Sequence, residues 1–491
     1  MAVDTSATLL TRRALLTLGG AVAGVSLLAA CAPTPPSPSA APAPAGAGPT
    51  PPPGAAAAKA APATAAKDVT LTWITPAEIG LERDFYTQFS QQFEQANPGI
   101  KVQVSFEAWS DYFTKLPTIF AGGTIPDMIH LHASIVQEYG LRGTVRNLFE
   151  YMQRDGISKD VWFPFLIEQM SDYKTKTSLW ALPKDSAVYA FYYNKDAFDK
   201  AGVPYPKSSW TFDEFRQTAK LVTLDKNGNN AASAAFDPSA IVQWGVNWGD
   251  NPTDTILPGS DQWQATAWGH AGLWFSEDLS RAYFDDPDHV DFLQQIVDMR
   301  CKDHAIPMTG DSMGQGNAWR NGLVAMTIAH HSQVFFYNAE KKTFKFDVTP
   351  APVGKNGQFD AAGCSGWAIP VKSQHPDEAW EFIKFLTNEN TQCTIVKAKR
   401  WGSAIKPCEN NLLPDDNNPP NFKEVLYSPM LGQSSVKTQA IAYPPLLSEM
   451  RQVWKNEFDA VFNCGGGQVA EAARSAQPQI QAILDKAAHL T

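Results

Sequence analysis

Tryptophan is the residue type whose distribution in this chain first points to a ligand. The sequence has fifteen Trp, and five fall close together: Trp244, Trp248, Trp263, Trp268 and Trp274. Sugars present apolar C–H faces that pack on aromatic rings, while Asp, His and Asn side chains hydrogen-bond the surrounding hydroxyls. A cleft lined by Trp with scattered polar groups therefore suits a sugar. The alternative is that most of these Trp pack in the core or on the surface.

Histidine pairs are the second group with possible chemistry. His130 and His132 follow an apolar run, and His330 and His331 follow another. Neighbouring residues of a strand point to opposite faces, so His330 and His331 would not share one metal ion. His130 and His132 point the same way if their strand continues, but neither an H-E-x-x-H pattern nor a carboxylate triad accompanies them. The sequence predicts no metal site and no cofactor.

Enzyme motifs are missing from the sequence. There is no G-x-S-x-G, no phosphate-binding loop of the Walker type and no dinucleotide-binding glycine pattern. A secreted glycoside hydrolase would need two facing carboxylates, which spacing alone cannot pair. The sequence therefore predicts a binding protein, and a secreted carbohydrate-active enzyme remains an alternative.

The N-terminus predicts export. Arg12-Arg13 precede an apolar run from Ala14 to Leu28, which is too short and too rich in Gly and Ala to span a bilayer. The paired arginines resemble a twin-arginine signal. Leu28-Ala29-Ala30-Cys31 resembles the lipobox of bacterial lipoproteins, whose Cys is acylated and becomes the first residue after cleavage. We therefore expect residues 1–30 to be a signal peptide and Cys31 to be the lipidation site. An ordinary secretory signal with a chance Cys is the alternative.

Composition separates a tether from a body. Residues 31–67 are mostly Ala and Pro, which cannot build a core, so a lipid-anchored tether is expected there. Residues 68–491 are too many for one ordinary core and predict two lobes. The net charge of −10 argues against a nucleic-acid partner. No later apolar run is long enough for a second membrane anchor.

Five cysteines remain besides Cys31, at wide spacings: Cys301, Cys364, Cys393, Cys408 and Cys464. No CxxC pattern points to zinc. Export permits disulfides, and Cys393–Cys408 is the favoured pair because it is the closest. Buried free thiols are the alternative, and a twin-arginine route would favour it, since folding would then precede export from a reducing cytosol.

Alternating strands and helices must position these side chains. Residues 69–74 and 100–107 have the pattern of strands, and Leu81, Phe85, Phe89 and Phe93 form one apolar helical face between them. This order predicts a parallel βαβ unit and an α/β fold. Thr211 and Glu214 form a capping box that opens another helix. Asp225 to Asn229 reads as a solvated turn, because the spacing of a calcium loop fails.

Several sequence blocks together carry a family resemblance. The chain resembles the family 1 extracellular solute-binding proteins, which include maltose-binding-protein-like lipoproteins of ABC transporters. The blocks occur in family order along nearly the whole body: Phe93–Val102 (FEQANPGIKV), Ala121–Asp127 (AGGTIPD), Tyr192–Asp196 (YYNKD) with Ala201–Pro204 (AGVP), Phe346–Gly354, and His375–Phe382 (HPDEAWEF).

The resemblance implies a two-lobed periplasmic-binding-protein-like fold of class II, with hinge strands between the lobes. Hinge strands are expected near residues 187–193 and 348–352, with a third crossing around residues 391–405. Lobe one would then comprise residues 68–187 and 352–395, and lobe two residues 188–351 and 396–491.

Ligand contacts are expected at the carboxyl ends of strands. The resemblance adds Asp185, before the first hinge strand, Tyr189 within it, and the Gly-rich segment at Gly366 and Trp367. The expected ligand-binding residues are Trp73, Trp109, His130, His132, Asp185, Tyr189, Trp248, Trp263, His330, His331, Gly366 and Trp367.

The resemblance also implies a function. The protein would be a monomeric receptor, anchored to the outer face of the cytoplasmic membrane, that captures a small molecule, most often a carbohydrate, and delivers it to ABC permease subunits. Ligand would bridge the lobes and stabilise a closed state. A polyol, a glycerol phosphate or a peptide is the alternative ligand within this class. A surface lectin without a transporter is an alternative from another class.

Overall fold

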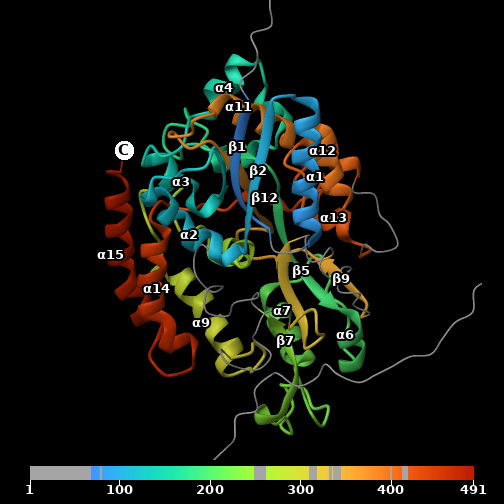
Figure 1. Cartoon of the computed structure of the whole chain (residues 1–491). Helices are drawn as coiled ribbons and strands as arrows, with labels where there is room; N and C mark the ends of the chain where they lie inside the picture. The colour runs from blue at the N-terminus through green and yellow to red at the C-terminus, as the bar shows by residue number, and fades with distance from the viewer. Residues whose placement is uncertain are drawn as a thin grey trace, which may run out of the picture. The chain divides into compact units, whose positions relative to one another are not determined.

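The computed structural model describes residues 68–77, 80–247, 261–308, 318–330, 334, 344–398, 401–411 and 419–490. The expected signal peptide 1–30, Cys31 and the tether 31–67 lie outside these residues, as do Trp248 and His331. Two mixed sheets with helices on their faces make up the described body (Figure 1). Among the described residues, no helix has the length and apolar character needed to cross a membrane.

The first sheet has the strand order β2-β1-β3-β11-β4. Its strands are β1 (Val69–Pro76), β2 (Ile100–Glu107), β3 (Met128–His132), β4 (Leu182–Pro183) and β11 (Ser365–Ala368). β1 pairs in parallel with β2 and with β3, so the expected βαβ unit is confirmed. β11 runs antiparallel to β3 and β4. The parallel strands place the carboxyl ends of β1 and β3 at the same edge.

The second sheet has the order β12-β10-β5-β8-β7-β6, and β9 also pairs with β5. Its strands are β5 (Ala187–Asn194), β6 (Leu224–Asp225), β7 (Ile241–Asn247), β8 (Val324–His330), β9 (Phe346–Thr349), β10 (Phe359–Gly363) and β12 (Lys437–Ala440). β5 is buried along nearly its whole length, which explains why its sequence reads as a continuous apolar run.

The helices follow the apolar periodicity of the sequence. They are α1 (Gly80–Ala96), α2 (Trp109–Gly122), α3 (Ala133–Leu141), α4 (Leu148–Arg154), α5 (Pro164–Met170), α6 (Lys195–Ala201), α7 (Phe212–Val222), α8 (Gln264–His270), α9 (Pro287–Cys301), α11 (Pro376–Thr387), α12 (Glu389–Lys397), α13 (Phe422–Leu426), α14 (Leu447–Phe462) and α15 (Val469–Ala487). Short 3₁₀ turns lie at Lys159–Val161, Pro238–Ala240 and Lys406–Asn411. The capping box of α7 is confirmed, since Thr211 and Glu214 each bond the other's backbone.

The chain passes between the sheets at two neighbouring places. One passage joins β4 to β5, and the other joins β10 to β11 at Cys364. The boundary between the lobes that was expected at residue 352 therefore lies at about residue 364. After a turn at residues 354–357, the chain forms β10, which pairs antiparallel with β5 in the second sheet. Residues 352–363 thus belong with the second sheet.

A further passage also differs from the expected place. Residues 402 and 405 still form bridges with Ser186 and Trp162 beside the first sheet, and the chain reaches the second sheet only with α13, which packs on β5 and β9. The crossing expected at residues 391–405 therefore comes later in the chain.

Two disulfides hold loops in the body. Cys393–Cys408 is the pair that the sequence favoured, and it closes a 15-residue separation between α12 and the following 3₁₀ turn. Cys301–Cys464, with a separation of 163, joins the end of α9 to the turn between α14 and α15 and was not expected. Cys364 is a buried free thiol. The alternative of buried free thiols therefore does not hold for the other four cysteines.

Candidate functional site

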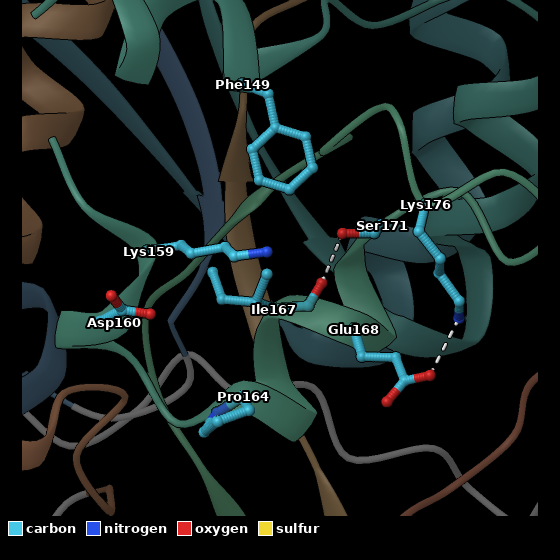
Figure 2. Close-up of a pocket in the computed structure, with 8 residues that line it drawn as sticks. All are labelled: Phe149, Lys159, Asp160, Pro164, Ile167, Glu168, Ser171 and Lys176. Carbon is cyan, nitrogen blue, oxygen red and sulfur yellow. Dashed lines mark hydrogen bonds and ion pairs between the residues drawn. The ribbon is translucent and has the colours of Figure 1, made fainter. Parts of the chain in front are cut away.

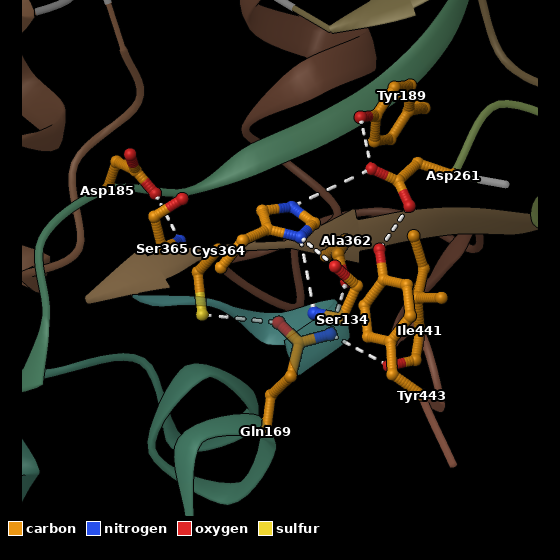
Figure 3. Close-up of polar contacts among 11 residues, drawn as sticks. Ser134, Gln169, Asp185, Tyr189, Asp261, Ala362, Cys364, Ser365, Ile441 and Tyr443 are labelled. Atoms are coloured by element: carbon orange, nitrogen blue, oxygen red, sulfur yellow. Dashed lines mark hydrogen bonds and ion pairs between the residues drawn. The ribbon is translucent and has the colours of Figure 1, made fainter. Parts of the chain in front are cut away.

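A polar cluster lies where the two sheets approach each other (Figure 3). The Asp261 carboxylate accepts a hydrogen bond of 2.8 Å from the Tyr189 hydroxyl of β5, and a second from the Tyr443 hydroxyl, which follows β12. Nε2 of His132, the last residue of β3, lies 3.9 Å from Asp261 Oδ2. We call these four residues the Asp261 cluster. It brings the end of a first-sheet strand to two tyrosines of the second sheet.

His132 is oriented by the start of the helix that follows it. Its Nδ1 accepts the backbone N–H of Ser134 at 3.2 Å and lies 2.8 Å from the Ser134 hydroxyl. Because Nδ1 is an acceptor, the neutral ring carries its proton on Nε2, the atom that faces Asp261. The separation of 3.9 Å is too long for a direct hydrogen bond.

Burial fixes the protonation states of the cluster. Burial lowers the pKa of His132, although the charges of Asp261 and Asp185 oppose this shift. Burial and the charge of Asp261 raise the pKa of Tyr189 and of Tyr443 well above the usual value. At neutral pH the ring is therefore uncharged and both phenols keep their protons.

Trp109 adds an accessible aromatic ring beside the cluster. It is the first residue of α2 and is 41% exposed, one of the largest exposed apolar side chains. Its ring meets those of His132 and His130 edge to face, with centroids 5.7 and 5.6 Å apart. An exposed indole next to polar groups that can hydrogen-bond hydroxyls is compatible with a ligand that has both an apolar face and hydroxyls.

Asp185 ties the two neighbouring passages together. Its Oδ1 accepts the backbone N–H of Ser365 at 2.7 Å, and its Oδ2 pairs with Lys184 Nζ at 2.6 Å. The Lys184 ammonium lies over the rings of Trp401, at 3.9 Å, and Trp367, at 5.3 Å. Both charged residues are buried. The structure thus gives Asp185 protein partners on both oxygens, in the passage from β4 to β5.

Other expected ligand contacts lie inside the body. Trp73 is 1% exposed and packs edge-on against Trp367 and Tyr86. A Cβ atom at Gly366 would lie 2.8 Å from the carbonyl oxygen of Leu182, so this glycine permits the close pairing of β11 and β4. Trp263 is also buried, against Phe191 and Phe215. Trp73 lies within β1, Gly366 within β11 and Trp263 directly before α8, so none of the three ends a strand, and the two Trp side chains face the core in this structure.

The remaining expected residues flank the cluster. His130 is buried among aromatic rings, and neither ring nitrogen hydrogen-bonds another described residue. Burial lowers its pKa well below the usual value. His330 ends β8 directly opposite Tyr189, with ring centroids 5.5 Å apart.

Asp261 and Tyr443 were missed from the sequence. Asp261 lies in the Trp-rich segment, two residues before Trp263, and a carboxylate among clustered Trp is the signal that could have found it. Tyr443 follows an edge strand of only four residues, and no local pattern marks it.

Among the described residues, no three His, Cys, Asp or Glu side chains are grouped as the ligands of a metal ion would be. In the Asp225 turn, the carboxylate accepts the backbone N–H groups of Asn227, Asn229 and Asp237. A cavity of about 190 Å³ beside α5 is lined partly by the Glu168–Lys176 ion pair (Figure 2) and contains none of the Asp261 cluster.

Comparison with known proteins identifies relatives over about two thirds of the chain. Residues 80–392 match the family described as bacterial extracellular solute-binding protein. A putative binding protein of Brucella abortus is 23% identical over 319 residues, which cover 64% of this chain and 71% of that protein. The erythritol/L-threitol-binding protein of Mycolicibacterium smegmatis is 25% identical over 63% of this chain and 65% of its own length.

Solved structures share the fold. An ABC substrate-binding protein of Listeria monocytogenes in complex with cycloalternan superposes with a TM-score of 0.71 and 21% identity, over 85% of this chain and 100% of that chain. A maltose-bound protein of T. maritima gives a TM-score of 0.65 and 19% identity, over 84% and 100%.

Proposed function

Because the chain belongs to the bacterial extracellular solute-binding protein family, we propose that it captures a carbohydrate or a related polyol between its two sheets and delivers it to the permease of an ABC importer. The Asp261 cluster is the observation that carries this proposal. Its members come from both sheets, and they combine a carboxylate, two phenols and an imidazole with the exposed ring of Trp109.

The chemistry of the cluster suits a neutral hydroxylated ligand. The Asp261 carboxylate accepts hydrogen bonds, and the protonated Nε2 of His132 can donate one. A sugar hydroxyl both donates and accepts, so it can bridge these two groups, which are 3.9 Å apart, from one side, at about 2.8 Å from each. The ring of Trp109 then offers its face to the C–H groups of the sugar.

Capture follows from contacts made to both sheets at once. A ligand that touches His132 on the first sheet and Asp261 with its two tyrosines on the second stabilises the arrangement in which these groups are close. The equilibrium shifts only by the difference in ligand affinity between this arrangement and a more open one. The closed receptor would be the form that docks on the permease.

We further propose that the receptor is a monomer held at the outer face of the cytoplasmic membrane by an acyl chain on Cys31, with residues 31–67 as the tether. The lipobox-like segment supports this proposal, and a relative in Streptomyces antibioticus, 22% identical over 60% of this chain, is named an uncharacterized lipoprotein. A tether raises the effective concentration of the receptor near its permease.

Thermal unfolding with a ligand panel tests the proposed function. A bound ligand raises the melting temperature by mass action, about 2.7 kcal/mol of stabilisation at a hundredfold excess over Kd. We expect a neutral sugar or polyol, from glucose, maltose, erythritol and larger oligosaccharides, to stabilise the protein, and Asp261→Asn to reduce that shift. If only glycerol 3-phosphate or peptides stabilise the protein, the ligand belongs to one of those classes instead. If none of the compounds raises the melting temperature, the proposal that the protein captures these solutes is contradicted.

An assay for turnover separates the binding protein from the enzyme alternative. The ligand that stabilises the protein is incubated with it and the products are analysed by chromatography. We expect the ligand to be recovered unchanged, and its hydrolysis would instead support a carbohydrate-active enzyme.

A further inference from the structure

The two disulfides of the body differ in their access to solvent. Cys464 is exposed and begins an exposed stretch, residues 464–468, in the turn between α14 and α15. Its partner Cys301, the last residue of α9, is partly buried. In the other bridge, Cys393 is 8% exposed and Cys408 is fully buried, and we call this pair the buried bridge. Thiol–disulfide exchange requires a thiolate to reach a sulfur atom, so Cys464 is the most accessible of these four positions.

The backbone of the turn leaves Cys464 uncovered on one side. Cys464 has a φ of +58°, a left-handed conformation that residues other than glycine rarely adopt. Three glycines follow it, and Gly466 and Gly467 have φ values of +105° and +92°. Gly465, Gly466 and Gly467 place no side chain over the bridge. On another side, the Sδ atom of Met308 lies 3.7 Å from Cys464 Sγ.

The bridge fastens α9 to the helical hairpin formed by α14 and α15 (Figure 1). The two helices of the hairpin pack on each other, and both also pack on α9. Trp454 of α14 meets the rings of Trp274 and Phe284 with centroids 6.3 and 5.6 Å apart. The hairpin therefore has apolar contacts that do not depend on the bridge.

Two glutamines of α15 add hydrogen bonds to the segment between α8 and α9. Gln477 accepts the backbone N–H of Phe284 at 2.8 Å and donates to the Ala282 carbonyl at 2.8 Å. Gln481 accepts the N–H of Ala282 at 3.0 Å and donates to the Ser280 carbonyl at 2.8 Å. The glutamines are four residues apart on one face of α15, and they bond this backbone at alternate residues as a neighbouring strand would. These bonds hold the hairpin in place when the bridge is open.

We propose that Cys301–Cys464 is a redox-sensitive clip, which a dithiol reductant opens by attack at Cys464 while the body stays folded. A thiolate of the reductant forms a mixed disulfide with Cys464 Sγ, the bond to Cys301 Sγ breaks, and Cys301 leaves as a thiolate that takes a proton from water. The second thiolate of the reductant then displaces Cys464, which is protonated in turn. The protein gains two thiols, and the reductant is oxidised to its disulfide.

Reversibility follows from the contacts that remain. Because the hairpin keeps its packing and the bonds of Gln477 and Gln481, the two thiols of the open clip stay close to each other. A disulfide oxidant such as oxidised glutathione therefore restores the bridge by the reverse exchange. The clip lies outside the Asp261 cluster, so this proposal does not depend on the ligand.

Timed reduction of the folded full chain tests the clip. The protein is treated with dithiothreitol at neutral pH without denaturant, quenched with acid, then unfolded and labelled with N-ethylmaleimide, and the labelled cysteines are identified by peptide mass spectrometry. We expect the clip to be reduced at least about tenfold faster than the buried bridge. A parallel pulse of iodoacetamide on the unquenched protein uses Cys364 as the control, because this buried thiol reacts only when the body unfolds.

Two outcomes of this experiment would overturn the proposal. One is reduction of the clip no faster than reduction of the buried bridge. The other is labelling of Cys364 at the rate at which the clip opens, which would show that opening requires unfolding.

Glutathione, a monothiol, identifies the sulfur that is attacked. After brief treatment with excess glutathione and an acid quench, we expect the mixed disulfide on Cys464. A mixed disulfide found mainly on Cys301 would contradict the assignment of the attack.

Matched variants show whether mild reduction acts through the clip. After the same brief treatment with dithiothreitol, removal of the reductant and blocking of free thiols, the melting temperature of the parent should fall. Cys393→Ser/Cys408→Ser keeps the clip and should respond in the same way, whereas Cys301→Ser/Cys464→Ser lacks it and should not respond. A fall in Cys301→Ser/Cys464→Ser as large as that in the parent would overturn the proposal. The proposed function would survive that outcome, because the Asp261 cluster does not include the bridge.

Discussion

At the scale of single residues, the site depends on two phenols that hold one carboxylate. Tyr189 lies in β5 and Tyr443 follows β12, and they donate to different oxygens of Asp261. A hydrogen bond to a charged group contributes about 1.5–3 kcal/mol. The two tyrosines therefore fix the direction in which Asp261 faces a ligand.

Replacing either tyrosine by Phe removes a donor and keeps the ring. We expect Tyr189→Phe and Tyr443→Phe each to weaken ligand binding by about tenfold, measured by calorimetry with the ligand that the panel identifies. The double variant should depart from additivity, since both act on one carboxylate. Tyr205→Phe is the control, because its exposed phenol donates to Asp199 at 2.7 Å far from the cluster. Affinities within twofold of the parent would contradict this role for the tyrosines.

The buried histidines predict how stability depends on pH. Burial lowers the pKa of His130 and of His132 in the folded protein, whereas unfolded His titrates near 6.5. As pH falls below about 6.5, the unfolded chain binds protons that the folded protein does not, and the free energy of unfolding decreases. We expect a loss of about 1.4 kcal/mol per pH unit for each histidine, until the pH reaches its folded pKa.

Denaturant unfolding between pH 7.5 and about pH 5.5 measures this slope, above the range in which most carboxylates titrate. His130→Phe keeps a ring among the aromatic neighbours and removes one titrating group, so its slope should be smaller. Equal slopes for this variant and the parent would show that His130 does not contribute.

At the scale of elements, the sequence predicted the helices and strands whose pattern of apolar residues is local. The βαβ unit and the capping box of α7 are confirmed, and the apolar stripe of α7 is buried. The sequence also located His132 at the end of its strand, whereas Tyr189 came from the family resemblance. The direction of a strand side chain depends on one residue of register, and Trp73 and Trp367 face the core.

Contacts between segments that are far apart in the chain could not be predicted from local sequence patterns. The passage at Cys364 follows from the pairing of β10 with β5, and Asp261 gains its role from strands far away in the chain. Cys301–Cys464 was missed for the same reason, because no local pattern links residues separated by 163 positions.

The two disulfides should differ in their effect on stability. Closing a loop of about 15 residues contributes about 3 kcal/mol in the chain-entropy model, and a loop longer than 100 residues more than about 4.7. We expect the double variant Cys301→Ser/Cys464→Ser to lower the free energy of unfolding more than Cys393→Ser/Cys408→Ser does, measured by urea denaturation. Cys364→Ser is the control for the loss of a buried thiol that forms no bridge. The reverse order of the two double variants would contradict the expectation.

At the scale of the whole molecule, ligand contact and chain passage lie close together. The Asp261 cluster joins a strand end of the first sheet to the second sheet, and Asp185 binds Ser365 where two passages run side by side (Figure 3). The position of the Asp261 cluster predicts that a ligand touches both sheets. The bond between Asp185 and Ser365 should limit how the sheets move relative to each other.

The bond between Asp185 and Ser365 has a consequence for how such a receptor diversifies. Because this bond fastens two of the three passages at one point, we expect the sheets to swivel about it, with a few backbone torsions absorbing the motion. Loops at the strand ends lie outside that swivel. Substitutions in these loops can therefore change which solute is bound and leave the relative motion of the sheets unchanged. New ligand specificities can arise in this way without a change in the conformation that the transporter recognises.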